Sequence, residues 1–214
     1  MSKNFFILSF LFFYYICNFS FAKERDVEYF KRGYQFYQKE DYKNAAFCCK
    51  RCLKANPNNF DCNFLLAKIY SEKGKTKASI KYLLRSKNLK PDDYRVWLSL
   101  GSIYKSKNEL KIAKEYLNKA ILLNPYSAAS LIELADLYLK EKNYIQTIIY
   151  ANKGVKLNTE DAWGYYILGI AYLNIDDKEN ALSAYNKLKD LDKNLADKLL
   201  RKIKYNNFYK KIKD

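Results

Sequence analysis

The sequence predicts an all-α fold, a solenoid of about five stacked two-helix units followed by a C-terminal capping helix. The 214-residue chain has only three prolines, and successive ones (Pro57, Pro91 and Pro125) lie 34 residues apart. A constant period of this length is typical of helix-turn-helix repeats. Because proline cannot continue a helix, each of these prolines marks the end of one unit.

Apolar and small residues recur in the frame that the prolines define. When each proline is set at position 32, positions 4, 7, 8 and 11 follow the spacing of one helical face. Positions 20, 24 and 27 do the same on a second helix. Position 8 is Gly or Ala in every unit, so the two helices can approach closely, and stacking buries the apolar face of each unit. The frame predicts repeats at 26–59, 60–93, 94–127, 128–161 and 162–195.

Turn residues separate the two helices of a unit. They are pairs of small, polar or acidic residues, and in repeats two to five they read Gly74-Lys75, Lys107-Asn108, Lys142-Asn143 and Asp176-Asp177. Such pairs end one helix and allow the next to begin, since glycine, asparagine and aspartate tolerate turn conformations.

With these columns in place, the sequence resembles the tetratricopeptide repeat family from Asp26 to about Leu195. The match in the third repeat consists of Trp97, Leu100, Gly101, Tyr104, Ala113, Ala120 and Pro125. The resemblance implies a right-handed solenoid whose first helices line a concave groove for a protein or peptide. Arg32 replaces an apolar residue in the first repeat and Asn63 an aromatic one in the second, while Thr159 and Lys193 replace the closing proline.

The resemblance also implies which residues line the groove, because positions 2, 5, 9 and 12 of each repeat point inward in this family. The predicted groove residues are Phe30, Tyr34, Tyr37, Phe64, Lys68, Arg95, Leu98, Lys105, Ile132, Trp163 and Tyr166. This groove is aromatic at both ends and basic in the middle, a composition that suits a peptide or helix with apolar and some acidic side chains. In the alternative interpretation, the N-terminal aromatics pack on residues 23–28 or on one another.

The N-terminus carries a separate signal. Residues 5–21 are almost wholly apolar, and Ser20-Phe21-Ala22 offers small residues at the places that a signal peptidase reads. Residues 1–22 are therefore predicted to be a signal peptide or an N-terminal membrane anchor, and the protein to be exported to the periplasm or cell envelope. An uncleaved anchor would be near the lower length limit for a bilayer span. A lipoprotein modified at Cys17 is the third alternative.

The chain is basic, with 39 Lys and Arg against 23 Asp and Glu. The charges are spread through all repeats rather than gathered in one stripe, and residues 196–214 are the densest part. These residues also have an apolar face that includes Leu199 and Ile203, so they are predicted to form a basic C-terminal capping helix. The charge is interpreted as a solvated surface that keeps the array soluble. Contact of the tail with anionic membrane is the alternative.

Four cysteines follow the N-terminal segment: Cys48, Cys49, Cys52 and Cys62. The chain has no histidine to complete a zinc site, and a Cys-x-x-Cys pair in the middle of a helix does not suit a redox motif. The cysteines are therefore expected to pack in the core. If the chain is exported, a Cys52–Cys62 disulfide across the repeat boundary is the candidate.

No catalytic constellation is visible, because the chain has no histidine and no Gly-rich phosphate loop. We expect neither an enzyme nor a bound cofactor or metal. The sequence favours an exported scaffold or adaptor that binds a protein or peptide, in cell-envelope assembly or maintenance, with membrane association through residues 5–21. The alternatives are a non-catalytic subunit of an envelope enzyme complex and a helical-repeat RNA-binding protein. A signal sequence and the lack of a basic stripe argue against nucleic acid.

Overall fold

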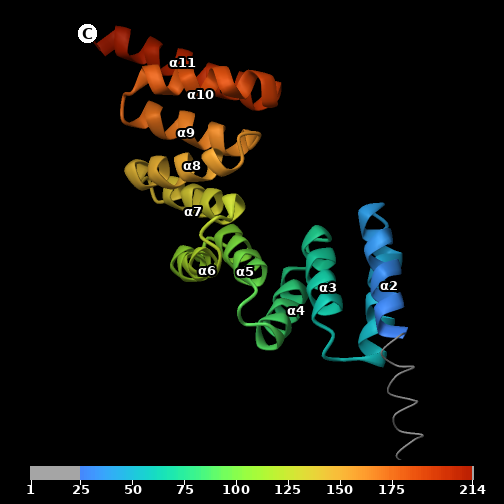
Figure 1. Ribbon diagram of the computed structural model, residues 1–214. Coiled ribbons are helices and arrows are strands. Elements are labelled where there is room, and N and C mark those ends of the chain that lie inside the picture. Colours follow the sequence, from blue (N-terminus) through green and yellow to red (C-terminus); the bar gives the residue numbers. More distant parts are fainter. Residues whose placement is uncertain (1–24, 214) are drawn as a thin grey trace, which may run out of the picture. The chain divides into compact units, whose positions relative to one another are not determined.

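The computed structural model describes the backbone of residues 25–213 and the side chains of residues 25–205 (Figure 1). The predicted segment 1–22 lies outside the described residues. The chain divides into two compact units, the first ending at Asp92 and the second beginning at Asp93. All regular secondary structure from residue 25 to residue 213 is α-helical, with no strand, and consecutive helices pack as helix-turn-helix pairs. The predicted fold class is confirmed.

The first unit contains four helices. They are an N-terminal helix, of which residues 25–38 are described, and α2 (Tyr42–Ala55), α3 (Phe60–Glu72) and α4 (Thr76–Leu89). The second unit continues the same alternation, and its helices follow one another in chain order in Figure 1. They are α5 (Tyr94–Ser106), α6 (Leu110–Leu123), α7 (Ala128–Lys140), α8 (Tyr144–Leu157), α9 (Ala162–Asn174), α10 (Lys178–Leu191) and α11 (Lys193–Lys213).

The helix starts repeat with the proline-defined period. Within the described chain, α3, α5, α7 and α9 have 13 residues each and begin at the residue where the frame starts a repeat. The second helices of the five repeats, α2, α4, α6, α8 and α10, have 14 residues each. A single sequence period therefore sets both the length and the phase of these helices.

The turn inside each repeat has one conformation, whatever its sequence. Position 15 has a left-handed backbone in all five repeats, at Glu40, Gly74, Asn108, Lys142 and Asp176, with φ between 58° and 65°. The next residue donates its backbone N–H to a carbonyl five residues earlier, as from Lys75 to Tyr70 at 2.8 Å. This bond satisfies a carbonyl that the helix end would otherwise leave without a partner. Only one of the five positions is glycine, so the stacking of the helices sustains a conformation that other residues rarely adopt.

Small residues let the two helices of a repeat approach closely. A Cβ added to Gly101 on α5 would lie 2.6 Å from Leu117 Cγ on α6. At position 20, Ala45 and Ala113 are fully buried, and Ser79 is buried there with its hydroxyl donating to the Ala67 carbonyl at 2.8 Å. The column therefore accepts a polar residue only where a backbone acceptor lies within reach.

The cysteines have two different roles in the first unit. Cys52 on α2 and Cys62 on α3 form a disulfide with their Cα atoms 6.5 Å apart. Cys48 and Cys49 are free thiols buried between the N-terminal helix and α2, where Cys49 Sγ lies 3.2 Å from a Cβ placed on Gly33. Burial raises the pKa of Cys49 to about 12, so this thiol stays protonated and packs as a small apolar group.

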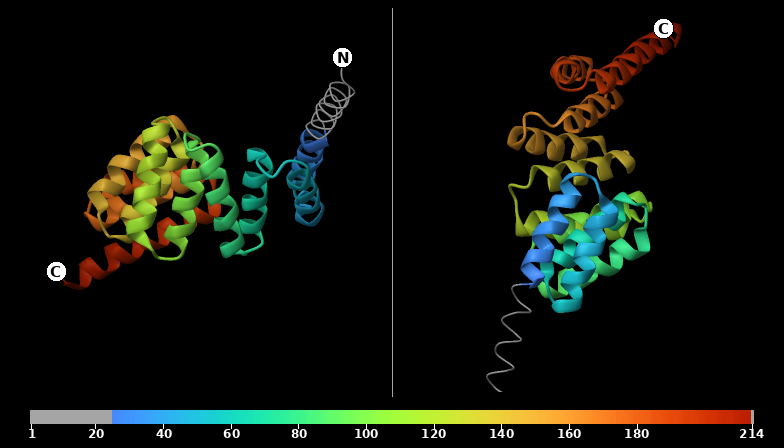
Figure 2. Two further views of the ribbon diagram at one scale, coloured as in Figure 1. Left: turned by 90° about the horizontal axis from the view of Figure 1, so that it is seen from below. Right: turned by 90° about the vertical axis from the view of Figure 1, so that its right-hand side faces the viewer.

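The last helix ends the repeat array. α11 packs against α9 and α10, and its final turns extend past them in both views of Figure 2. In the 34-residue frame, α11 takes the place of the first helix of a further repeat, with Leu199 at position 4 and Ile203 at position 8. Both side chains are buried. Each repeat has Gly or Ala at position 8, so an isoleucine there removes the space that a paired second helix would need.

We expect Gly169→Ala to loosen this cap. A Cβ at residue 169 would overlap Leu199 Cδ2 of α11, so the substitution should lower the free energy of unfolding by about 1–3 kcal/mol. Leu199→Ala alone should cost about 2–4 kcal/mol, because it leaves a cavity in the cluster that contains Leu188 and Ile203. Urea unfolding of the double variant should show a loss smaller than the sum, since Leu199→Ala removes the overlapping methyl. If the two losses of unfolding free energy simply added, the proposed contact between residue 169 and Leu199 would be contradicted.

Candidate partner-binding surfaces

One contact recurs between the first helices of neighbouring repeats. Position 12 of one repeat touches position 9 of the next, 31 residues later. In the first unit, Lys68 Nζ lies 5.1 Å from the ring centre of Tyr37. In the second unit, Lys105 Nζ forms an ion pair with the Asp136 carboxylate. Positions 9 and 12 therefore share one surface in each unit, which we call the inner face of that unit.

The inner face of the first unit is aromatic. Tyr34 is 46% exposed, and its ring centre lies 6.1 Å from that of Phe30. Phe30 and Tyr37 are half-buried against a core cluster that includes Leu66, and burial, followed by the nearby Glu72 carboxylate, raises the pKa of Tyr37. The alternative interpretation thus holds in part, because Phe30 and Tyr34 do contact each other. Tyr34 has the most exposed ring of the three.

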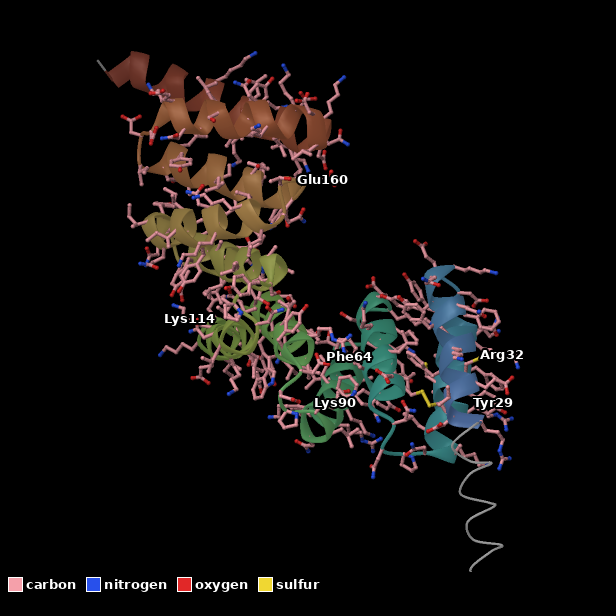
Figure 3. All side chains as sticks on the ribbon, viewed as in Figure 1. Tyr29, Arg32, Phe64, Lys90, Lys114 and Glu160 are labelled. Carbon is pink, nitrogen blue, oxygen red and sulfur yellow. A yellow bond between two sulfur atoms is a disulfide. The ribbon has the colours of Figure 1, made fainter. Side chains whose placement is uncertain are left out.

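Phe64 lies on α3 of the same unit (Figure 3). Its ring stacks on that of Phe60, with the centres 5.9 Å apart and the planes 7° from parallel. Lys90 Nζ lies 4.4 Å from the ring centre of Phe60. Phe60 is only 5% exposed, so the stack holds the half-buried ring of Phe64 against the core.

Two of the three cations predicted for the groove, Arg95 and Lys105, already have carboxylate partners. The Arg95 guanidinium lies against Asp93, with Nη2–Oδ2 at 2.5 Å and Nε–Oδ1 at 2.9 Å. Lys105 is only 8% exposed, and its ammonium contacts both Glu133, at 2.9 Å, and Asp136. Burial disfavours the charged form of Lys105, yet the two carboxylates outweigh it and raise the pKa of this lysine above its ordinary value. These two cations are therefore not a free positive patch.

The remaining predicted residues divide between core and surface. Ile132 is only 4% exposed and belongs to a core cluster, so it offers no surface to a partner. Leu98 is half-buried against Leu117 and its neighbours. Trp163 is 43% exposed and stacks on Tyr166, with ring centres 5.2 Å apart. Tyr166 itself is half-buried, and burial raises its pKa.

Two exposed apolar residues in the second unit fall outside the predicted groove. Leu122 and Tyr126, at the end of α6 and in the loop after it, are among the most exposed large apolar side chains of the described chain. The frame places them at positions 29 and 33, which belong to no packing column. The sequence signal for these two exposed residues is a large apolar side chain at a position that no packing column uses.

Metal ligands and membrane spans are both absent from the described part of the chain. Residues 25–213 contain no group of three or more Cys, Asp or Glu side chains arranged to hold a metal ion. None of the described helices is long and apolar enough to cross a lipid bilayer.

The helical hairpins, their common turn and the inner face of each unit define a helical-repeat protein. A family model described as tetratricopeptide repeat matches residues 94–127 and 164–195, and a second model with the same description matches residues 36–103. The chain belongs to the tetratricopeptide repeat family, whose members are generally non-catalytic scaffolds.

Solved structures share the fold at low identity. A structure of MamA is 24% identical and covers 82% of this chain and 96% of its own, with a TM-score of 0.65. YrrB, "a TPR protein with an unusual peptide-binding site", is 17% identical over 81% and 91%, with a TM-score of 0.62. PilW, a "widely conserved type IV pilus biogenesis factor", is 15% identical over 77% and 76%, with a TM-score of 0.71. The comparison with curated proteins found no match.

Proposed function

We propose that this protein is an exported scaffold or adaptor that holds a protein or peptide partner on the inner faces of its repeats and acts in cell-envelope assembly or maintenance. One observation carries the proposal: the contact from position 12 to position 9 recurs in both units, and two large aromatic rings, Tyr34 at position 9 and Trp163 at position 2 of α9, are exposed at positions that face the groove in the family. Tyr34 and Trp163 are the most exposed of the aromatic residues predicted for the groove.

The chemistry of the inner faces favours an apolar partner segment. Because Arg95 and Lys105 are paired with carboxylates of this chain, an acidic partner gains less from them than the sequence suggested. Exposed aromatic rings bury a large area at a small cost in conformational entropy, as is typical of binding hot spots. We therefore propose a peptide or helix that presents apolar side chains to Tyr34 and Trp163.

Three further observations support the proposal. Two proteins of the same fold have related roles: YrrB is described as having a peptide-binding site, and PilW as a factor in type IV pilus biogenesis. The apolar segment 5–21 supports export. The Cys52–Cys62 disulfide is consistent with it, since disulfides persist mainly in oxidising compartments.

The test replaces the two exposed rings. We expect Tyr34→Ala and Trp163→Ala each to weaken partner binding by about tenfold or more, because central aromatic residues dominate interface energies. The partner is first recovered from the protein's own cells by purification with the tagged full chain. It is then purified and titrated with each variant by calorimetry, which measures the affinity. Phe30 is unsuitable for this test, since it is half-buried against the core and its loss would also lower stability.

Tyr126→Ala is the matched control. Tyr126 is 80% exposed and lies in the loop between α6 and α7, so its loss should leave both stability and partner affinity unchanged. Equal affinities for the wild type, the two inner-face variants and this control would exclude the inner faces as the binding surface.

A further inference from the structure

A basic hollow lies on the first unit between the N-terminal helix and the end of α2. It is lined by Arg25 and Tyr29 from the first of these helices and by Arg51, Lys54 and Ala55 from the second. Because the two helices run in opposite directions, the beginning of one meets the end of the other, and three cationic residues and one tyrosine line the same hollow. The sequence frame did not predict this cluster, since its residues come from two helices that the 34-residue period does not relate.

The neighbouring acids in the described part of the chain form no ion pair with Arg51 or Lys54. Asp26 is buried and accepts hydrogen bonds from the Asn56 amide at 2.6 Å and the Asn59 amide at 3.2 Å. Glu28 is exposed and lies 3.9 Å from Arg32. Among the described residues, no carboxylate forms an ion pair with Arg51 or Lys54, and α2 contains no acidic residue at all.

An exposed aromatic ring adjoins the same cations. Phe47 lies one turn before Arg51 on α2, is 56% exposed, and has the Arg51 guanidinium 5.3 Å from its ring centre. On the facing helix, Tyr29 and Arg32 point to one side, away from α3 (Figure 3). Basic side chains interspersed with exposed aromatic rings are typical of surfaces that lie at the headgroup level of a membrane.

The hollow also lies close in sequence to the predicted membrane segment. Arg25 follows residues 5–21 after only three residues, and a chain of that length spans about 10 Å. A basic cluster directly beside an apolar segment is attracted to the anionic lipids of the same membrane surface. This places a cationic site within reach of any bilayer that holds residues 5–21.

We propose that this hollow binds the phosphate groups of anionic lipids and so docks the first repeat onto the membrane surface. The inference rests on the proposed export of the chain. Arg51 and Lys54 supply the charge for a headgroup phosphate, the Tyr29 hydroxyl donates a hydrogen bond to it, and Phe47 enters the interface beside them. The docked edge is the beginning of the repeat array.

The test compares partition of the full chain into vesicles of phosphatidylglycerol and of phosphatidylcholine. The apolar segment contributes about equally to both, so the ratio of the two partition coefficients isolates the charged site. Arg51→Gln combined with Lys54→Gln should lower this ratio about 25-fold, since each basic residue near an anionic surface contributes roughly fivefold. Raising the salt to about 1 M should remove the difference, because screening shortens the range of the attraction.

Lys77→Gln combined with Lys81→Gln is the matched control. Both lysines are exposed on α4 of the same unit, so their replacement removes the same number of positive charges at a different position. The ratio for this control should change by less than about threefold. An equal fall for both pairs would overturn the proposal, since net charge alone would then explain the binding, and an unchanged ratio for the test pair would also overturn it. If the chain does not bind phosphatidylcholine vesicles, the result argues against a membrane role for the apolar segment, and therefore against export. It does not test the basic hollow, which the ratio of the two partition coefficients measures.

Discussion

Removing the disulfide with Cys52→Ala and Cys62→Ala should lower the free energy of unfolding by about 3 kcal/mol. The bond closes a loop with a sequence separation of 10 residues and so restricts the unfolded chain. It also joins α2 to α3 across the boundary between the first two repeats, and both sulfur-bearing residues are fully buried. Urea unfolding followed by circular dichroism gives the difference.

The same experiment has two internal controls. A reducing agent should lower the stability of the wild type by a similar amount and leave the double variant unchanged. Cys48→Ala removes a buried thiol without touching the disulfide and should retain the response to the reducing agent. If the wild type does not respond, and non-reduced peptides contain only free thiols at residues 52 and 62, the disulfide does not form in the protein.

Lys105→Met should destabilise the second unit by about 3 kcal/mol, because it leaves the carboxylates of Glu133 and Asp136 facing each other without their cation. Lys107→Met is the matched control on the same helix end. Its ammonium pairs with Glu109, but both groups are exposed, so its loss should cost less than about 1 kcal/mol. Thermal or urea unfolding of the two variants measures the contrast, and equal effects would contradict a special role for the buried ion pair.

The Lys105 ion pair also predicts a pH dependence. The folded state raises the pKa of Lys105, so its stabilising contribution is fully present below the ordinary lysine pKa and is lost as the pH rises through the higher folded value. The stability difference between the wild type and Lys105→Met should therefore be constant near neutral pH and shrink in strongly alkaline solution. The stability difference between the two proteins is measured because the raised pKa of Tyr166 affects the stability of both alike and so cancels.

The repeat frame predicted the fold well because close packing depends on residue size at fixed spacing. Gly101 illustrates this: the column of small residues at position 8 follows directly from the contact with Leu117. The left-handed turns were harder to predict. Gly74, Asn108 and Asp176 are residue types that favour this conformation, while Glu40 and Lys142 adopt it because the flanking helices are held by stacking.

The predicted groove stays a prediction, and particular residues show why the repeat spacing alone could not place every side chain. Ile132 occupies a position that faces the groove in the family. Here its side chain enters the space left by Gly154 and Gly164, since a Cβ on either residue would lie within 2.8 Å of Ile132 Cδ1. The spacing of one helix cannot reveal a gap opened by glycines on two others. The carboxylate partners of Lys105 were also missed, because they belong to the next repeat.

The central claim is that the inner faces of the repeats hold another polypeptide. Site-directed photo-crosslinking in intact cells tests it most directly, with a photoreactive amino acid placed singly at Tyr34, Trp163, Tyr126 or Leu182. The last two residues are exposed controls, in the loop before α7 and on α10. We predict adducts with a polypeptide partner from residues 34 and 163 and none from the controls. Adducts from the controls alone, or equally from all four positions, would contradict the claim.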